Sequence, residues 1–448
     1  MKKLFNLFKI KQIQLDDRII WGILHKCWGF ISGPVTTLII IFYLNQEFQG
    51  YFYTFMQIAA LSQISDMGLN TIFLFIIGKK YSVFKNDNTD LDNLESTSAG
   101  ELRSILSLMY RYLLIIPFIA FPLVYFSGVF FFNIEESVNI QWELAWLLLS
   151  AVVAFDVASS FLIAHLEALN KVKLSNQLKL LKAMITSLTL WVLLTNNYKL
   201  LSLPISLSFG TIVFLCIYLY LFRYTIMSVV SNKQKLTISW KNDIWPFQWR
   251  MAITWIFGSY ILNNMSIIVV FYFLGPIKAG MFGLTFAVSE IILHTSHIWM
   301  ETITPKITFL VSDRKDNQAK DLLRSRLFQA IVVTFILGVF FFIALFIIKL
   351  NFNNIYIRFM PLYTIPVILL AGIFRHVIHA QTIFIRAHQK ENMMPSYVVA
   401  GISSLVFSII LVPQFDLLGI CLSILLVKTI IQLPTSSYIY YNFIRTNK

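Results

Sequence analysis

The sequence predicts an all-α polytopic membrane protein, with about twelve transmembrane helices arranged in two six-helix bundles. The first observation behind this prediction is composition, because 57% of the 448 residues are hydrophobic, only 13% are charged and the mean hydropathy is +0.72. A soluble domain would carry about twice that charged fraction. The second observation is a series of apolar runs along the chain, and the third is a likeness between its two halves.

The apolar runs have the length that a membrane crossing requires, which is about 20 mainly apolar residues. In the first half they fall at 19–44, 50–78, 105–132, 143–169, 174–195 and 201–227. In the second half they fall at 248–274, 278–303, 326–350, 359–387, 394–412 and 414–441. An even number of crossings places both termini on the same side of the membrane.

Lysine and arginine orient these crossings, because both residues are enriched in loops on the cytoplasmic side. Most of the 36 lie in the N-terminal segment, in alternate loops and in the C-terminal tail. The intervening loops carry only Lys199, Lys278, Lys349 and Arg358. We therefore expect both termini in the cytoplasm. The net charge of +14 then reflects membrane topology, and no nucleic-acid partner is expected.

The two halves share a short motif. Residues 39–52 (IIIFYLNQEFQGYF) align with residues 269–282 (VVFYFLGPIKAGMF) at a constant offset. In each piece an aromatic helix end and a short turn precede a glycine that opens the next helix, Gly50 in one and Gly280 in the other. Two six-helix halves of the same orientation form a parallel pseudo-repeat about an axis along the membrane normal. Two-lobed, MATE-like transporters are the main fold with this layout.

The repeat divides the chain into a cytoplasmic N-terminal segment and two lobes joined by a linker. The linker is basic and contains Trp240 and Trp245, a composition typical of segments that lie in the headgroup region. The expected boundaries are 1–18 for the N-terminal segment, 19–227 for the first lobe, 228–247 for the interfacial linker and 248–444 for the second lobe.

Several ionisable side chains fall well inside the expected crossings. They are Lys26, Asp66, Arg111, Asp156, Glu290, Arg375 and Lys428. Each costs on the order of 2.5–3.5 kcal/mol at the bilayer centre, so roughly 20 kcal/mol together if all faced lipid. Most must therefore face a wet cavity or one another. Structural pairs, such as Asp66 with Lys26, are one alternative, and snorkelling of Lys26 and Arg111 to the headgroups is another.

Two helical stripes indicate which faces turn to a cavity. Glu290, His294, His297 and Glu301 follow spacings of four, three and four, which place them on one face of the eighth crossing. The tenth crossing repeats the pattern with Arg375, His379, Thr382 and Arg386, and His376 lies beside them. A polar stripe on an otherwise apolar helix marks the side that faces a cavity.

The chain shows no pattern for a metal, a nucleotide or a catalytic group. One helix presents at most two metal ligands at a suitable distance, so no metal site is expected, and the three cysteines lie far apart. There is no GxxxxGK[ST] motif for ATP. No cofactor is expected, and transport would draw on an H⁺ or Na⁺ gradient, on the substrate gradient or on consumption of the product.

Three stretches resemble a known family. Residues 61–73 (LSQISDMGLNTIF) resemble the Asp-x-Gly-Leu signature of Wzx-type flippases for lipid-linked oligosaccharides. Residues 248–261 (QWRMAITWIFGSYI) with 275–288 (GPIKAGMFGLTFAV), and 383–392 (IFIRAHQKEN), are similar to stretches of polysaccharide-export proteins. Both groups belong to the multidrug/oligosaccharidyl-lipid/polysaccharide (MOP) exporter superfamily.

The resemblance implies a V-shaped pair of six-helix bundles that exchanges inward-open and outward-open states. It implies an undecaprenyl-pyrophosphate-linked oligosaccharide, an O-antigen or capsule repeat unit, as the substrate. It also implies the bacterial cytoplasmic (inner) membrane, polysaccharide assembly proteins as partners and a monomer as the working unit.

The intramembrane residues fit such a substrate. A pyrophosphate needs several cations to replace its hydration, and the planar fork of arginine suits phosphate. The substrate-binding candidates are the cations Lys26, Arg111, Arg375 and Lys428, and the histidines His294, His297, His376 and His379. The candidates for binding a coupling H⁺ or Na⁺ are Asp66, Asp156 and Glu290, for which pairing with the cations is an equal alternative.

Three functions remain in competition. The leading one is a flippase that moves the lipid-linked oligosaccharide from the cytoplasmic to the outer leaflet by alternating access. The alternative is an ion-coupled multidrug or organic-cation exporter of the same superfamily, which would need an acidic, aromatic cavity. A membrane-embedded glycosyltransferase or assembly scaffold would need a sizeable loop, whereas the longest loop, 79–103, has the composition of a solvated turn. We expect no enzyme.

Overall fold

The computed structural model describes residues 17–66, 68–86, 97–133, 140–231, 244–388 and 392–446. Nearly all of the expected N-terminal segment 1–18, most of the linker 228–247 and the middle of loop 79–103 lie outside these ranges. Every regular element in the described ranges is helical, with no strand. The predicted all-α class is confirmed.

The first half contains seven α-helices and two 3₁₀ segments. They are α2 (Asp17–Tyr43), α3 (Gln46–Ala59), η2 (Ala60–Asp66), α4 (Leu69–Asn86), α5 (Thr97–Phe132), α6 (Glu143–Ala168), α7 (Val172–Thr195), η3 (Lys199–Leu201) and α8 (Ser202–Ser231). The turns after α6 and α7 use left-handed residues, Asn170 (φ 58°) and Asn197 (φ 62°). Asparagine tolerates this backbone conformation better than most residues.

The second half is also helical. Its elements are α9 (Trp245–Trp255), the π-helix η5 (Ile256–Asn264), α10 (Met265–Glu301), α11 (Thr304–Ser312), α12 (Asp316–Asn351), α13 (Asn353–Tyr356), η6 (Leu362–Thr364), α14 (Ile365–Ala387), α15 (Met394–Leu426), the π-helix η7 (Val427–Gln432) and α16 (Leu433–Thr446). Gly275 (φ 80°, ψ 175°) splits α10 and Asp416 (φ 57°, ψ −140°) splits α15, because neither residue has helical angles.

The structure accommodates the predicted twelve crossings although only nine described helical runs are long and apolar enough to span a membrane. Two of these runs, 265–311 and 394–446, each contain two crossings that meet at a sharp turn. The twelfth crossing is the interrupted stretch from α3 to α4. Most other boundaries follow those of the predicted segments to within a few residues, but α5 begins eight residues before its predicted crossing and α12 ten residues before.

The two halves share one apolar core at one end of the molecule. A continuous cluster joins Tyr51, Phe55 and Trp146 of the first half with Phe271 and Phe282 of the second. The rings of Tyr51 and Phe271 meet edge to face with their centroids 5.1 Å apart. Such close packing is what holds helices together in lipid, where the hydrophobic effect between them is absent. We call this region the shared end.

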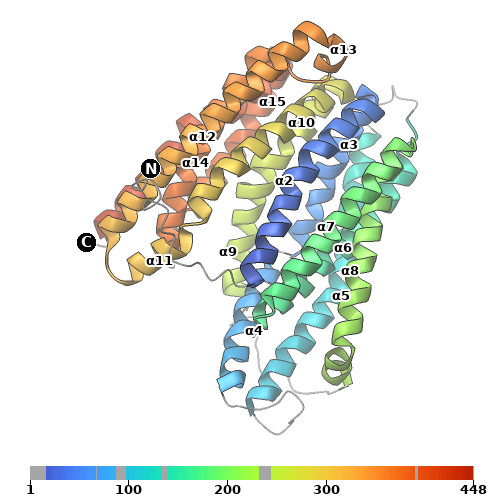
Figure 1. Cartoon of the computed structure of the whole chain (residues 1–448). Helices are drawn as coiled ribbons and strands as arrows, with labels where there is room; N and C mark the ends of the chain where they lie inside the picture. The colour runs from blue at the N-terminus through green and yellow to red at the C-terminus, as the bar shows by residue number, and fades with distance from the viewer. Residues whose placement is uncertain are drawn as a thin grey trace, which may run out of the picture.

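At the opposite end each half has a core of its own, and we call this the divergent end. One apolar cluster, around Phe73 and Phe161, contains first-half residues together with Ile244 of the linker, and another, around Ile307 and Phe384, contains only second-half residues. Figure 1 shows the helices converging near α3 and α13, whereas α4 and α11 lie far apart. The two bundles therefore form a V.

The glycines paired by the sequence repeat lie against each other at the shared end. A Cβ atom on Gly280 would lie 2.9 Å from the backbone nitrogen of Gly50, and a Cβ atom on Gly50 would overlap the carbonyl group of Pro276. Equivalent residues of two related halves meet only near the axis that relates them. The pseudo-twofold axis therefore passes through the crossing of α3 and α10.

Hydrogen bonds between the two halves stabilise the same crossing of α3 and α10. The Gln49 side chain is 1% exposed, and its Nε2 donates to the Gly280 carbonyl oxygen at 2.8 Å and to the Arg358 carbonyl oxygen at 3.4 Å. The Arg358 guanidinium donates to the Leu44 carbonyl oxygen. Backbone carbonyls of one half thus receive donors from the other, which satisfies polar groups that would be costly to bury unpaired.

The second predicted crossing, 50–78, is broken rather than continuous. The chain leaves α3 through the 3₁₀ segment η2 and turns at Gly68, whose φ of 76° is left-handed. Asp66 accepts hydrogen bonds from the Asn70 backbone N–H at 3.0 Å and side-chain amide at 2.7 Å, so it caps the start of α4. The prediction treated 50–78 as one apolar run because long apolar stretches flank residues 62–68 (SQISDMG), although these residues are themselves mostly polar.

Replacing Gly68 by alanine is expected to destabilise this turn. The left-handed φ costs a residue with a Cβ atom about 1–2 kcal/mol, and that Cβ atom would lie 2.9 Å from the Cβ atom of Met251 in the second half. Thermal unfolding of the purified protein in detergent should show a lower midpoint for Gly68→Ala. The control is Gly29→Ala, since nothing lies within 4 Å of a Cβ atom there. Equal midpoints for the two variants would contradict the strained-turn account.

Candidate functional site

An acid–base pair joins the two polar stripes of the second half. Arg375 Nη1 of α14 donates to Glu290 Oε1 at 2.6 Å and to Oε2 at 2.9 Å, where Glu290 belongs to α10. His294, one turn along α10, has its Nε2 at 3.4 Å from Glu290 Oε2. The two stripes therefore face each other, which their helical spacing alone did not predict, and the glutamate neutralises the arginine.

Three histidines pack beside this pair. The ring of His297 lies 4.5 Å from the ring of His376 and 4.7 Å from the ring of His379, measured between centroids. His376 is fully buried, and its Nε2 lies 2.7 Å from the hydroxyl oxygen of Thr334. His297 Nε2 and His376 Nδ1 have no hydrogen-bond partner within the described part of the chain. Two ring nitrogens near the Arg375–Glu290 pair can therefore still form a hydrogen bond.

Lys428 lies in a π-helical segment of the same half. It is 9% exposed, and its ammonium group donates to Gln432 Oε1 at 2.7 Å within η7. Arg375 and Glu290 are its electrostatic neighbours. We call the group of Glu290, Arg375, the four histidines and Lys428 the basic cluster, since it contains two basic side chains and four imidazoles for one carboxylate.

A second, weaker ion pair links the two halves next to the basic cluster. Lys26 of α2 lies 3.4 Å from Glu301 of α10, and their side chains are 62% and 47% exposed. Such an exposed pair contributes about 0–1 kcal/mol. Both residues line a cavity of about 290 Å³ together with His294. The cavity places one cation of the first half within reach of the same ligand as the basic cluster.

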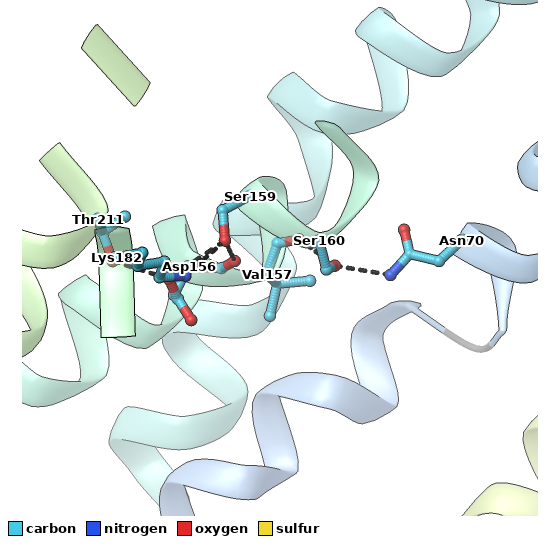
Figure 2. A network of polar contacts seen from close by, with 7 residues as sticks. All are labelled: Asn70, Asp156, Val157, Ser159, Ser160, Lys182 and Thr211. Carbon is cyan, nitrogen blue, oxygen red and sulfur yellow. Dashed lines mark hydrogen bonds and ion pairs between the residues drawn. The ribbon is translucent and has the colours of Figure 1, made fainter. Parts of the chain in front are cut away.

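A polar network occupies the middle of the first half. Figure 2 shows Asp156 of α6 at its centre. Asp156 Oδ1 accepts from the Lys182 ammonium group and from the Thr211 hydroxyl at 2.7 Å, and Lys182 also donates to the Ser159 hydroxyl at 2.8 Å. The sequence left two roles open for Asp156, binding of a coupling ion or pairing with a cation. In the structure Asp156 forms an ion pair with Lys182.

The network forms part of the wall of a larger cavity, of about 710 Å³. Its walls come from α2, α3, η2, α4, α6, α7 and α8, and α9 of the second half contributes Met251 and Trp255. Asp66, Asn70 and Asp156 face it. The break in the second crossing therefore borders the cavity, in keeping with the discontinuous helices that form binding sites in many transporters.

Arg111 lies away from these groups, and Asp66 lacks the partner suggested for it. Arg111 is exposed on α5, on the side that also carries Leu114 (68% exposed) and Phe118 (82% exposed). An arginine on such a lipid-facing stripe can extend its guanidinium to the headgroups. Asp66 bonds to Asn70 and not to Lys26, so the pairing suggested for these two residues is not the one in the structure.

Sequence reasoning missed the partner of Asp156. Lys182 counted among the basic loop residues at the start of the crossing 174–195, but in the structure it lies well within α7, which begins at Val172. Its depth in an apolar run was the available signal, since a buried lysine requires a partner. Asn70, Thr211 and Gln432 were missed because neutral polar residues are common in transmembrane helices.

The described residues hold no group of three or more His, Cys, Asp or Glu side chains that could bind a metal ion. Cys27 and Cys216 are exposed, Cys421 is buried, and all three are free. The groups available to bind a ligand are therefore cations, imidazoles and carboxylates at cavities between the two helical halves.

Comparison with known proteins identifies the fold. No protein-family model and no curated protein sequence matches the chain. Lipid II flippase MurJ in an inward closed conformation is similar in structure, with a TM-score of 0.63 and 15% identity over 94% of this chain and 87% of that one. An inward-facing MATE multidrug resistance transporter of the MOP superfamily has a TM-score of 0.62 and 13% identity over 96% and 99%.

A third similar structure is a MOP superfamily transporter from Pyrococcus furiosus, described as having a binding pocket of reversed polarity. Its TM-score is 0.55, with 10% identity over 98% of this chain and 99% of that one. Identities this low establish the fold and not the substrate. The chain has the two-lobed fold of MOP-superfamily transporters, and it is a multi-pass membrane protein.

Proposed function

We propose that the chain is a flippase that moves an undecaprenyl-pyrophosphate-linked oligosaccharide, an O-antigen or capsule repeat unit, from the cytoplasmic to the outer leaflet. The observation that carries the proposal is the basic cluster together with Lys26. Lys26 and His294 line the 290 Å³ cavity, and Glu290, whose Oε2 lies 3.4 Å from His294 Nε2, connects this cavity to Arg375 and the other imidazoles behind it. The resemblance to Wzx-type flippases supports the same substrate class, and the fold that it shares with MurJ is compatible with it.

The ion pairs make the cations available to a phosphate. Glu301 holds Lys26 only weakly because both side chains are largely exposed. Glu290 occupies one edge of the Arg375 guanidinium through Nη1. A pyrophosphate that enters the 290 Å³ cavity would first meet Lys26 and His294, which line it. Arg375 lies behind Glu290, so the carboxylate would have to move aside before the arginine could bind phosphate with bidentate geometry. The imidazoles could then donate to the remaining phosphate or sugar oxygens.

Alternating access would connect this site to the two leaflets. In this account the divergent end faces the cytoplasm, as the distribution of lysine and arginine predicts, and the shared end closes the outer side. Opening the outer side requires the contacts among Gln49, Gly280 and Arg358 to separate. The protein would work as a monomer and could receive its substrate from polysaccharide assembly proteins.

Coupling to an H⁺ or Na⁺ gradient belongs to the same proposal. Glu290 would be released from Arg375 when phosphate binds and could then take up a cation. Asp66 bonds only to neutral donors among the described residues, which leaves its carboxylate available to the 710 Å³ cavity. Asp156 is a weaker candidate for the coupling ion, because Lys182 already provides its positive charge.

An ion-coupled exporter of drugs or organic cations is the second candidate. It is favoured by one observation, the 710 Å³ cavity, where an acidic group, Asp66, lies with the aromatic residues Phe52 and Trp255. The MATE transporter with a TM-score of 0.62 shows that the shared fold is compatible with this function too. A direct comparison of substrates is therefore needed.

Reconstitution tests the proposal. Purified protein in vesicles should accelerate the movement of a fluorescent, short-chain polyprenyl-pyrophosphate disaccharide between leaflets, measured as the fraction that dithionite quenches from outside. Inorganic pyrophosphate in excess should slow this movement. Vesicles that expel a rhodamine dye in a Na⁺ or H⁺ gradient, but leave the lipid-linked disaccharide in its leaflet, would contradict the flippase and support the exporter.

A further inference from the structure

The 710 Å³ cavity of the first half differs in chemistry from the basic cluster. Two ionisable residues, Asp66 and Asp156, line it, and no lysine, arginine or histidine does among the described residues. Its volume lies within the range of small-molecule pockets, about 300–1,000 Å³. The substrate of the proposed flippase has two chemically distinct parts, an anionic pyrophosphate and a hydroxyl-rich glycan, and the two sites differ in the same way.

The net charge of this cavity is negative. Lys182 neutralises Asp156, and the Thr211 and Ser159 hydroxyls complete its hydrogen bonding (Figure 2). Asp66 has no such cation among the described residues, because its oxygens accept from neutral donors, the Asn70 amide and the backbone N–H groups of Asn70 and Leu69. One carboxylate therefore faces the cavity without a counter-charge.

Hydrogen-bonding groups line this cavity. Asn70 Nδ2 donates both to Asp66 at 2.7 Å and to the Ser160 hydroxyl at 2.6 Å, and all three residues line the cavity. Asn70 Oδ1 and the Thr186 hydroxyl are buried within the protein, so the Asp66 carboxylate is the acceptor of this group that faces a guest. A carboxylate can accept several hydrogen bonds, and a guest that donates hydrogen bonds would use its remaining lone pairs.

A glycan matches this acceptor better than other parts of the substrate do. Sugar hydroxyls donate hydrogen bonds, and the C–H faces of sugar rings can pack on flat aromatic groups such as Phe52 and Trp255. Phosphate and carboxylate groups are ionised acceptors with no proton to donate. Either of them beside Asp66 would be repelled and could not donate a hydrogen bond to its carboxylate, and both effects lower affinity.

We infer that this cavity receives the glycan part of the substrate and selects neutral sugars or amino sugars over sugars that carry a carboxylate. The inference rests on the proposed function, since it assigns the second part of the same substrate. The basic cluster holds the pyrophosphate in every case, and the cavity distinguishes one repeat unit from another. Asp66 is the residue that provides the charge discrimination.

The test compares two lipid-linked disaccharides that differ only at C6 of the terminal sugar, glucose in one and glucuronate in the other. In vesicles with the wild-type protein, the glucose compound should move between leaflets at least about tenfold faster, which corresponds to about 1.4 kcal/mol of discrimination. Asp66→Asn, which keeps the acceptor for Asn70 and removes the charge, should reduce this ratio several-fold. Asp17→Asn is the matched control, because Asp17 pairs with Lys173 on the exposed surface, and its ratio should equal that of the wild type.

Equal rates for the two compounds with the wild-type protein would overturn the inference while the proposed function stands, and this comparison needs no variant. An unchanged ratio in a folded Asp66→Asn protein would also overturn it. Movement of neither compound would instead contradict the proposed function. Slower movement of the glucose compound in the presence of a rhodamine dye, with no slowing by free glucose disaccharide, would assign the cavity to organic cations and overturn the inference.

Discussion

The double variant Arg375→Met/Glu290→Gln is expected to fold normally and to lose export of the lipid-linked oligosaccharide almost completely. The native pair is a charge-assisted contact of 2.6 and 2.9 Å between two mostly buried groups. Removing one partner alone would leave an uncompensated charge in the membrane, at a cost of about 3–5 kcal/mol. Removing both charges together avoids this cost, so the fold should persist.

Export depends on Arg375 in a different way. If the guanidinium binds pyrophosphate, its loss should cost about 2–5 kcal/mol of substrate binding, so export should fall by roughly 30-fold or more even in the stable double variant. The measurement is the rate of movement of the disaccharide lipid in vesicles, with protein amount and thermal midpoint determined in parallel. Wild-type rates in the double variant would show that the pair is structural only.

Glu290→Gln and Arg375→Lys are the companion variants. Glu290→Gln keeps the arginine and frees it from its carboxylate, so pyrophosphate should inhibit transport at lower concentrations. Arg375→Lys keeps the charge but loses the planar fork, and should transport at an intermediate rate. This order of activities distinguishes a phosphate-binding arginine from one that only neutralises Glu290.

The variant Gly50→Ala is expected to prevent closure of the shared end. Even a single methyl group on Gly50 would overlap the backbone carbonyl of Pro276 across the two halves. Backbone cannot give way as a long side chain can, so α3 and α10 would have to separate. Overpacking of this kind costs about 1–3 kcal/mol, which shifts the balance between closed and open forms roughly 5- to 150-fold. Export should fall because the cycle needs both forms.

Labelling of a single cysteine measures this shift. Tyr53 is 6% exposed and packs against Gly283 of the second half, so Tyr53→Cys in a background without the native cysteines reports opening of the shared end. A membrane-impermeant maleimide should label it faster with Gly50→Ala than without. Gly78→Ala is the matched control, because the nearest atom to its Cβ would be 3.8 Å away, at ordinary contact distance. Full export and unchanged labelling with Gly50→Ala would contradict the proposed movement.

The sequence predicted the class of fold, the number of crossings and the faces of the polar helices. These features follow from the length of apolar runs and from helical spacing, and both can be read from a short stretch of the sequence. The stripe that begins at Glu290 illustrates both the success and its limit. Its members share a face as predicted, but Glu290 meets Arg375 of a neighbouring helix and Glu301 meets Lys26 of the other half. Spacing fixes the face of a residue, whereas its partner depends on which helices become neighbours.

The break in the second crossing could have been found more readily than the ion pairs. Asp66 and Gly68 stand two residues apart within an apolar run, and they provide a helix cap and a left-handed turn. A capping residue followed by a glycine is a local signal for a helix start. The pairing of Asp156 with Lys182 required the packing of α6 on α7, which no local pattern contains.

The central claim is that the chain exports a lipid-linked oligosaccharide, and lipid analysis of the host without the protein tests it most directly. Cells that lack the protein should accumulate undecaprenyl-pyrophosphate-linked oligosaccharide in the inner leaflet of the cytoplasmic membrane. The wild-type gene should remove the accumulated lipid, and Arg375→Met/Glu290→Gln, present at equal protein level, should not. Unchanged lipids in the deleted strain, combined with greater sensitivity to cationic drugs, would contradict the flippase and establish the exporter in its place.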